Sequence, residues 1–181
     1  APGGKTTHIA QRMENHGRIL AFDIYEEKIH RIEQNARRLG ISIIEAQMRD
    51  AREIGAAYEG LADRVLVDAP CSGLGVLRRK PDARWKKSAS DRKTLPPIQR
   101  AILWSAARAV KAGGVLVYST CTMEECENAA VVQDFLRAHP HFTLEQTGAF
   151  LPEQKTAEPM VQIMPETDGA DGFFIARMRR V

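Results

Sequence analysis

The chain has 181 residues, of which 44% are hydrophobic and 27% charged, with a formal net charge of +3. This length and composition predict one globular domain, residues 1–181, with a buried core. No apolar run reaches the roughly 18 residues of a membrane span. The three cysteines are too few for a secreted disulfide scaffold, so a reducing, cytoplasmic setting is expected.

Apolar runs alternate with amphipathic stretches along the chain. Residues 26–40 predict a helix that presents Ile29, Ile32, Ala36 and Leu39 on one face and stops at Gly40. Further helices are expected at 95–114 and 123–139, and strands at 18–24, 41–47, 63–69, 115–120, 160–165 and 172–178. This order predicts an α/β, Rossmann-like fold with a mostly parallel sheet and a C-terminal hairpin formed by the last two strands.

The first residues, APGGKTTHIAQRM, predict a glycine-rich loop that leads into a helix, with no strand before it. A doubly wound sheet has such a strand near its centre. We therefore expect that the domain's first strand lies upstream of this chain.

The glycine-rich loop allows two interpretations. Gly3, Gly4, Lys5 and Thr6 resemble the end of a phosphate-binding loop, and the strand ending at Asp68 would then supply the metal-binding acid of a nucleotide triphosphatase. Alternatively, the loop and the following helix N-terminus bind a nucleoside cofactor across the strand ends.

In the second interpretation, two strand-end acids complete the cofactor site. Asp23 lies about twenty residues after the loop, the spacing at which an acid accepts hydrogen bonds from ribose hydroxyls. Asp50 follows the next strand and is placed to accept a hydrogen bond from an adenine amine.

Two cysteines, Cys71 and Cys121, lie just beyond the ends of two expected strands, where open α/β sheets bind ligands. They could be small buried residues, or zinc ligands with Cys126 and a histidine, although the spacing between Cys121 and Cys126 is unusual for zinc. The third interpretation is a nucleophile with a helper.

A pyrimidine ring is a substrate that needs such a pair. Its carbon 5 becomes nucleophilic only after a thiolate has added to carbon 6. A carboxyl such as that of Asp68 favours this addition by hydrogen bonding at ring nitrogen 3. A second thiol then assists when the first is expelled.

Four motifs in order, APGGKT, DAPCSGLG, STCT with a following EN, and DGFF, resemble the RNA cytosine-5 methyltransferases of the NOP2/Sun family. The segments LPPIQRAIL and RRKPDARW are most similar to the bacterial RsmB/Sun branch, which modifies small-subunit ribosomal RNA. The resemblance covers residues 1–174. It implies S-adenosylmethionine as cofactor, RNA as partner, a monomer, and neither metal nor membrane. It also implies an N-terminal RNA-binding domain that this chain lacks.

The resemblance assigns roles to single residues. Cys121 is then the nucleophile, Cys71 assists product release, and Asp68 faces both cofactor and base. The remaining cofactor-binding residues are Ala1, Pro2, Gly3, Gly4, Lys5, Thr6, Asp23 and Asp50. The family often has a second glutamate after EN, where this chain has Ala129.

Residues 78–93 contain eight lysines and arginines against two aspartates, which is typical of a solvated loop or of a phosphate-binding patch. Because this segment follows Cys71, we predict that Arg78, Arg79 and Lys80 contact RNA phosphates. Trp85 could stack on a base or lie in the core. A P-loop triphosphatase and a non-catalytic RNA-binding module remain the alternatives.

Overall fold

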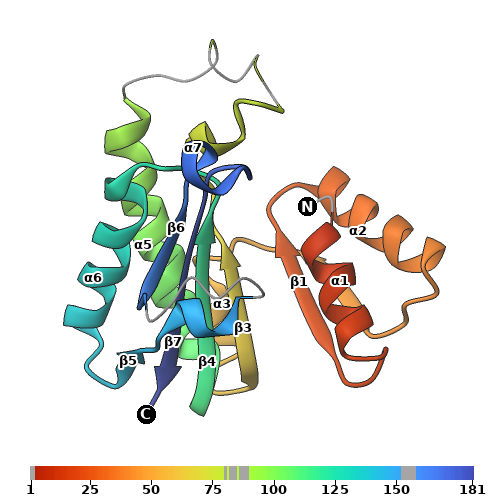
Figure 1. Cartoon of the computed structure of the whole chain (residues 1–181). Coiled ribbons are helices and arrows are strands. Elements are labelled where there is room, and N and C mark those ends of the chain that lie inside the picture. The colour runs from red at the N-terminus through yellow and green to blue at the C-terminus, as the bar shows by residue number, and fades with distance from the viewer. Residues whose placement is uncertain (1–2, 80, 82–84, 86–89, 152–157) are drawn as a thin grey trace. The chain divides into compact units, whose positions relative to one another are not determined.

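The computed structural model describes residues 3–79, 81, 85, 90–151 and 158–181 (Figure 1). The chain divides into two compact units, Ala1–Ile54 and Gly55–Val181.

The first unit is a helix–strand–helix–strand segment. It consists of α1 (Gly4–Arg12), β1 (Ile19–Asp23), α2 (Glu26–Arg38) and β2 (Ile44–Met48). Helix α2 carries the chain back to the end of the sheet at which β1 begins, so β2 runs parallel to β1. The apolar face predicted for α2 is confirmed for Ile29, Ile32 and Ala36, which are buried. Leu39 is 39% exposed, contrary to expectation, because it lies at the C-cap, where the helix is ending.

The second unit is built around one mixed sheet. Its strands are β3 (Ala62–Asp68), β4 (Val110–Thr120), β5 (Phe142–Leu144), β6 (Met160–Ile163) and β7 (Phe173–Arg180). Its helices are α3 (Ile54–Ala57), α5 (Asp91–Ala109), α6 (Ala129–Ala138) and α7 (Pro165–Asp168), with 3₁₀ turns η1 (Leu74–Val76), η2 (Glu125–Glu127) and η3 (Thr147–Phe150). The strand order is β3-β4-β7-β5, and β6 also pairs with β7.

Connection type decides strand direction in this sheet. The crossover helix α5 makes β3 and β4 parallel, and it packs against both strands and against α6 (Figure 1). The predicted C-terminal hairpin is confirmed, since β6 pairs antiparallel with β7 from Met160–Ala176 to Ile163–Phe173. Strand β7 is also antiparallel to β4 and β5, so the parallel pairings are those of the helix-linked strands β1–β2 and β3–β4.

Several element boundaries differ from the sequence-based expectation, and one strand was missed. Helix α5 begins at Asp91, ahead of its prolines, and ends at Ala109, because Val110 already belongs to β4. The helix expected over 123–139 is divided into η2 and α6 at Asn128, whose backbone leaves the helical region (φ −112°, ψ −102°). Strand β5 was not predicted, because its three residues are too few to show an alternation of apolar and polar side chains in the sequence.

Candidate active site

The loops that follow β3 and β4 carry both cysteines to one edge of the second unit's sheet. Asp68 and Ser119 are neighbours at the carboxyl ends of these parallel strands. The backbone N–H of Ala69 donates to the carbonyl of Ser119 at 2.9 Å, which keeps the two chains together as they leave the sheet. Cys71 and Cys121 follow within a few residues, so the expectation that they meet at this edge is correct.

The two cysteine sulfurs lie 3.3 Å apart, within hydrogen-bonding distance, and both residues are half-buried. The hydrogen bond to Cys121 and, after it, burial raise the pKa of Cys71 above that of an ordinary thiol. Cys71 therefore keeps its proton at neutral pH and can donate it to Cys121, although the geometry allows either sulfur to be the donor. A donor aimed at the sulfur of Cys121 stabilises negative charge on that atom.

The carboxylate of Asp68 is oriented by the neighbouring strand. Ser119 donates its hydroxyl hydrogen to Oδ1 of Asp68 at 3.2 Å. Asp68 is exposed at the strand end, so its carboxyl group is accessible to a ligand beyond the sheet.

A close contact between glycines joins the Cys71 loop to the start of β7. The N–H of Gly75 donates to the carbonyl of Cys121 at 3.0 Å, and the N–H of Gly172 donates to the carbonyl of Gly75 at 2.8 Å. A Cβ atom at Gly75 would lie 2.0 Å from the oxygen of Gly172, so only glycine fits. The DGFF motif at the end of the chain thus contacts the cysteine loops.

Polar residues that the sequence interpretation had not placed in the site surround these loops. Gln99, Glu127 and Asn128 are fully or almost fully buried and hydrogen-bond to residues that flank the cysteines. Gln99, which follows Ile98 in a segment predicted to be helical, offered a weak signal, whereas Glu127 lies in the polar run 124–128 and offered none.

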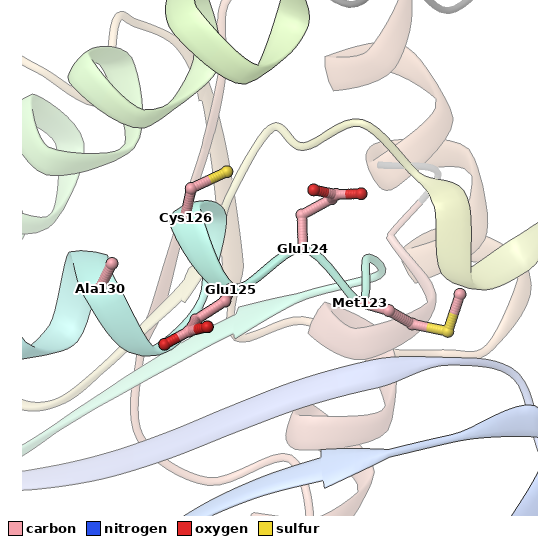
Figure 2. A pocket seen from close by; sticks show the side chains of 5 residues that line it. All are labelled: Met123, Glu124, Glu125, Cys126 and Ala130. Carbon is pink, nitrogen blue, oxygen red and sulfur yellow. The ribbon is translucent and has the colours of Figure 1, made fainter.

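The segment after Cys121 lines an open cavity of about 630 Å³, formed by Met123, Glu124, Glu125, Cys126 and Ala130 (Figure 2). The side chains of Glu125 and Cys126 project in different directions from η2. Neither Cys71 nor Cys121 lines this cavity, so it adjoins the nucleophile loop in sequence without containing the sulfur pair.

In the first unit, the glycine-rich loop ends in a left-handed residue that begins α1. Gly3 has φ +98°, a conformation that favours glycine, and a Cβ there would lie 3.2 Å from the Cα of Ile32, a tight contact with α2. Gly4 has no atom within 4 Å of its Cβ position, which leaves the helix N-terminus accessible. Lys5 is exposed and Thr6 half-buried in the first turn, while Ala1 and Pro2 lie outside the described residues.

The two acids predicted to bind a nucleoside lie at the ends of β1 and β2. Asp23 accepts from the N–H of Tyr25 at 3.1 Å and lies 3.4 Å from the ammonium group of Lys28. Asp50 lines a cavity of about 530 Å³ together with Ile24, Met48, Arg49 and Glu53, four residues that the sequence interpretation missed.

The carboxylate of Asp50 is already hydrogen-bonded within its own turn. Side-chain and backbone hydrogen bonds from Arg52 hold the pKa of Asp50 below its usual value, so it is ionised at neutral pH. The backbone N–H, Nε and Nη2 of Arg52 make four contacts with this carboxylate, two to each oxygen, so an amine of a ligand would share or displace one of these donors.

The arginines predicted to bind phosphate are exposed and lie next to the hairpin. Arg79 forms an ion pair with Asp171 (Nε–Oδ2 2.8 Å), and Arg78 is 3.5 Å from the carbonyl of Gly169. Lys80 lies outside the described residues. Trp85 is 86% exposed, so the interpretation that places it in the core is wrong.

Within the part of the chain that the structure describes, no group of three or more His, Cys, Asp or Glu side chains is arranged to hold a metal ion. No helix within these residues is both long and apolar enough to cross a bilayer.

Comparison with known proteins gives consistent matches along the chain. A family model described as 16S rRNA methyltransferase RsmB/F matches residues 1–179. The chain is 46% identical over 188 residues to the probable ribosomal RNA small subunit methyltransferase B of Bacillus subtilis, covering 99% of this chain and 41% of that protein. It is 38% identical over 184 residues to the ribosomal RNA small subunit methyltransferase F of Escherichia coli, covering 99% and 38%.

Among solved structures, NSun6 from Pyrococcus horikoshii with SFG has a TM-score of 0.87 and 36% identity, covering all of this chain and 46% of that one. The chain thus spans about two fifths of the length of the curated relatives it matches.

Proposed function

The chain belongs to the 16S rRNA methyltransferase RsmB/F family, and from this premise we propose that it transfers a methyl group from S-adenosylmethionine to carbon 5 of a cytosine in small-subunit ribosomal RNA. The family inferred from the sequence motifs is therefore correct. Membership of a methyltransferase family leaves the triphosphatase interpretation without support.

The observation that carries the proposal is the sulfur pair, with Cys71 and Cys121 3.3 Å apart at the strand edge that also holds Asp68. In the proposed reaction the thiolate of Cys121 adds to carbon 6 of the cytosine, forming a C–S bond and making carbon 5 electron-rich. The carboxyl group of Asp68 favours this addition by donating its proton to ring nitrogen 3, which can only accept, and it recovers the proton when the adduct breaks down. Carbon 5 is then methylated and loses its proton to solvent, and the electron pair left behind expels the Cys121 sulfur.

Cys71 acts at the last of these steps. Because its pKa is raised, it is a protonated thiol next to the departing sulfur, and its S–H hydrogen bond stabilises the thiolate that forms. Removing Cys71 should therefore slow breakdown of the adduct more than its formation.

S-adenosylmethionine, when bound, supplies the electrophilic methyl group. The residues present fit such a ligand, since the cavity at Asp50 combines the apolar side chains of Ile24 and Met48 with an ionised carboxylate. We assign the adenine to this cavity, the ribose hydroxyls to Asp23, and the methionine part to the loop at the start of α1. That loop comprises Ala1, Pro2, Gly3, Gly4, Lys5 and Thr6, and its helix N-terminus offers backbone N–H groups without intrahelical partners.

The test traps the covalent adduct. The full-length protein carrying Cys71→Ala is incubated with unmodified small-subunit RNA and S-adenosylmethionine and analysed on a denaturing gel. A slowly migrating RNA–protein band is expected, and it should vanish when Cys121→Ala is added. Cys126→Ala, a thiol in the same loop region but outside the sulfur pair, is the matched control and should not affect the band.

Other results would change the proposal in defined ways. If the wild type methylates the RNA but Cys71→Ala gives no band, the roles of the two cysteines are wrong. If the protein binds RNA and S-adenosylmethionine but neither methylates nor forms an adduct, it is a non-catalytic RNA-binding module.

A further inference from the structure

We propose that Glu127 and Gln99 are positioning residues, whose side chains together hold both peptide groups that flank Cys71 and thereby fix its thiol against Cys121. The expected effect on methylation rests on the proposed function, whereas the position of the Cys71 thiol can be probed without any turnover.

The first observation is a pair of buried side chains around Cys71. Glu127 and Gln99 are both fully buried. Oε2 of Glu127 accepts from the backbone N–H of Ser72 at 2.9 Å and from Nε2 of Gln99 at 2.8 Å. The same Nε2 of Gln99 donates to the carbonyl of Pro70 at 2.9 Å. The residues before and after Cys71 are thus tied to one carboxylate–amide pair.

The second observation concerns the loop of Cys121. Asn128, the residue after Glu127, donates from Nδ2 to the carbonyl of Thr122 at 3.0 Å and accepts from the hydroxyl of Thr120 at 2.5 Å. Thr120 and Thr122 are the two neighbours of Cys121. Two consecutive residues, Glu127 and Asn128, therefore hold the two cysteine loops, one loop each.

The third observation is that this dipeptide is itself anchored. The hydroxyl of Tyr118, a fully buried residue of β4, donates to the backbone carbonyl of Glu127 at 2.7 Å. The break between η2 and α6 falls at Asn128. The side chains of Glu127 and Asn128 leave the backbone at this break and reach different loops.

Burial of a glutamate argues for a specific role. A carboxyl group is costly to bury unless hydrogen bonds compensate its lost hydration. Here one compensating donor, the N–H of Ser72, belongs to the loop that carries Cys71, and the other, Nε2 of Gln99, also binds the carbonyl of Pro70 in that loop. The hydrogen bonds that stabilise the buried carboxyl group therefore also restrain the loop. If this position only had to fill space in the core, an apolar side chain would do so without the cost of burying a carboxyl group.

The test measures the environment of Cys71 directly. In the full-length protein with Cys126→Ala, the pH profile of iodoacetamide alkylation at Cys71 is followed by mass spectrometry. Glu127→Ala, and separately Gln99→Met, which keeps the length of the side chain but lacks its donors, should release the loop and weaken the contact with Cys121. The alkylation rate of Cys71 at about pH 8 should then rise at least about tenfold, the change in thiolate fraction that one pKa unit produces.

Two controls separate positioning from loss of stability. Glu127→Gln keeps one oxygen acceptor for Ser72 and Gln99. It alters Oε1, which has no hydrogen-bond partner among the described residues, so the profile should stay within about threefold of wild type. Ser105→Ala removes a buried hydrogen bond from the N–H of Gly55 (2.9 Å) elsewhere on α5 and should leave the profile unchanged.

The kinetic readout is the rate at which the RNA adduct breaks down, the step assigned to Cys71. A displacement of Cys71 or Cys121 by about 1 Å should lower kcat by roughly 100-fold while KM for RNA changes little. Alkylation profiles of Glu127→Ala and Gln99→Met that match wild type would overturn the positioning role, whatever the activity. If these profiles shift but wild type does not methylate RNA, the positioning role stands and the proposed function fails.

Discussion

Substitution of Gly75 by alanine should disable the site by pushing the two cysteine loops apart. Gly75 is buried between the carbonyl of Cys121 and the backbone of Gly172. The added Cβ would lie 2.0 Å from the oxygen of Gly172 and 2.9 Å from the oxygen of Cys121. Both obstacles are backbone atoms, which cannot rotate away as a flexible side chain would.

The size of the effect follows from these distances. Real Cβ atoms essentially never approach a heavy atom below 3.0 Å, so the Cβ and the Gly172 oxygen must separate by at least 1 Å, from 2.0 to 3.0 Å. This movement breaks or weakens the two backbone hydrogen bonds of Gly75, worth about 1 kcal/mol each. With about 1–3 kcal/mol of overpacking, unfolding should become about 3–5 kcal/mol easier. A shift of this size at the sulfur pair should lower kcat by roughly 100-fold.

The assay combines denaturant unfolding with adduct formation on RNA, expressed per folded molecule. Gly55→Ala is the matched control, because its Cβ would meet the backbone oxygen of Ser105 in α5 at 2.3 Å, the same kind of clash away from the cysteine loops. It should destabilise the protein comparably and leave activity per folded molecule near wild type. If Gly75→Ala retains wild-type kcat, or loses no more activity than Gly55→Ala, the inferred coupling between this glycine and the cysteines is wrong.

Cys121→Ala removes the hydrogen-bond partner of Cys71, so it should lower the pKa of Cys71 and speed its alkylation at about pH 8, as measured by peptide mass spectrometry. An unchanged rate would show that burial alone protects this thiol. Arg78→Gln should weaken RNA binding and reduce the slope of log K against log salt by about 1, because one phosphate contact is lost. Lys111→Gln, at the opposite end of β4 from Cys121, is its control, and equal slopes for the two variants would exclude Arg78 from the RNA interface.

The positions of most helices and strands could be inferred from the sequence because they depend on local pattern. The apolar spacing of α2 and the strand ending at Asp68 are properties of neighbouring residues. Parallel strands carry their carboxyl ends to one edge, so the meeting of Cys71 with Cys121 also followed from the order of elements. Leu39 was predicted to be buried but is exposed, because hydrophobic periodicity does not show at which residue the rest of the protein ceases to cover the helix.

Which polar side chains hydrogen-bond to one another could not be inferred from the sequence. Gln99, Glu127 and Ser72 are separated by 28 and 55 residues along the chain, and no local pattern links them. The ion pair of Arg79 with Asp171 likewise depends on the turn before β7 reaching the Cys71 loop.

The sequence by itself therefore determined the α/β class, the C-terminal hairpin, the edge that holds Asp68, Cys71 and Cys121, and the motifs of the family. Only the tertiary structure decided that β7 pairs with β4, that the helix over 123–139 breaks at Asn128, and that Glu127 and Gln99 hold the residues beside Cys71. The physical reason is that hydrophobic periodicity is set by adjacent residues, whereas a buried polar group is stable only when folding brings distant donors and acceptors into contact with it.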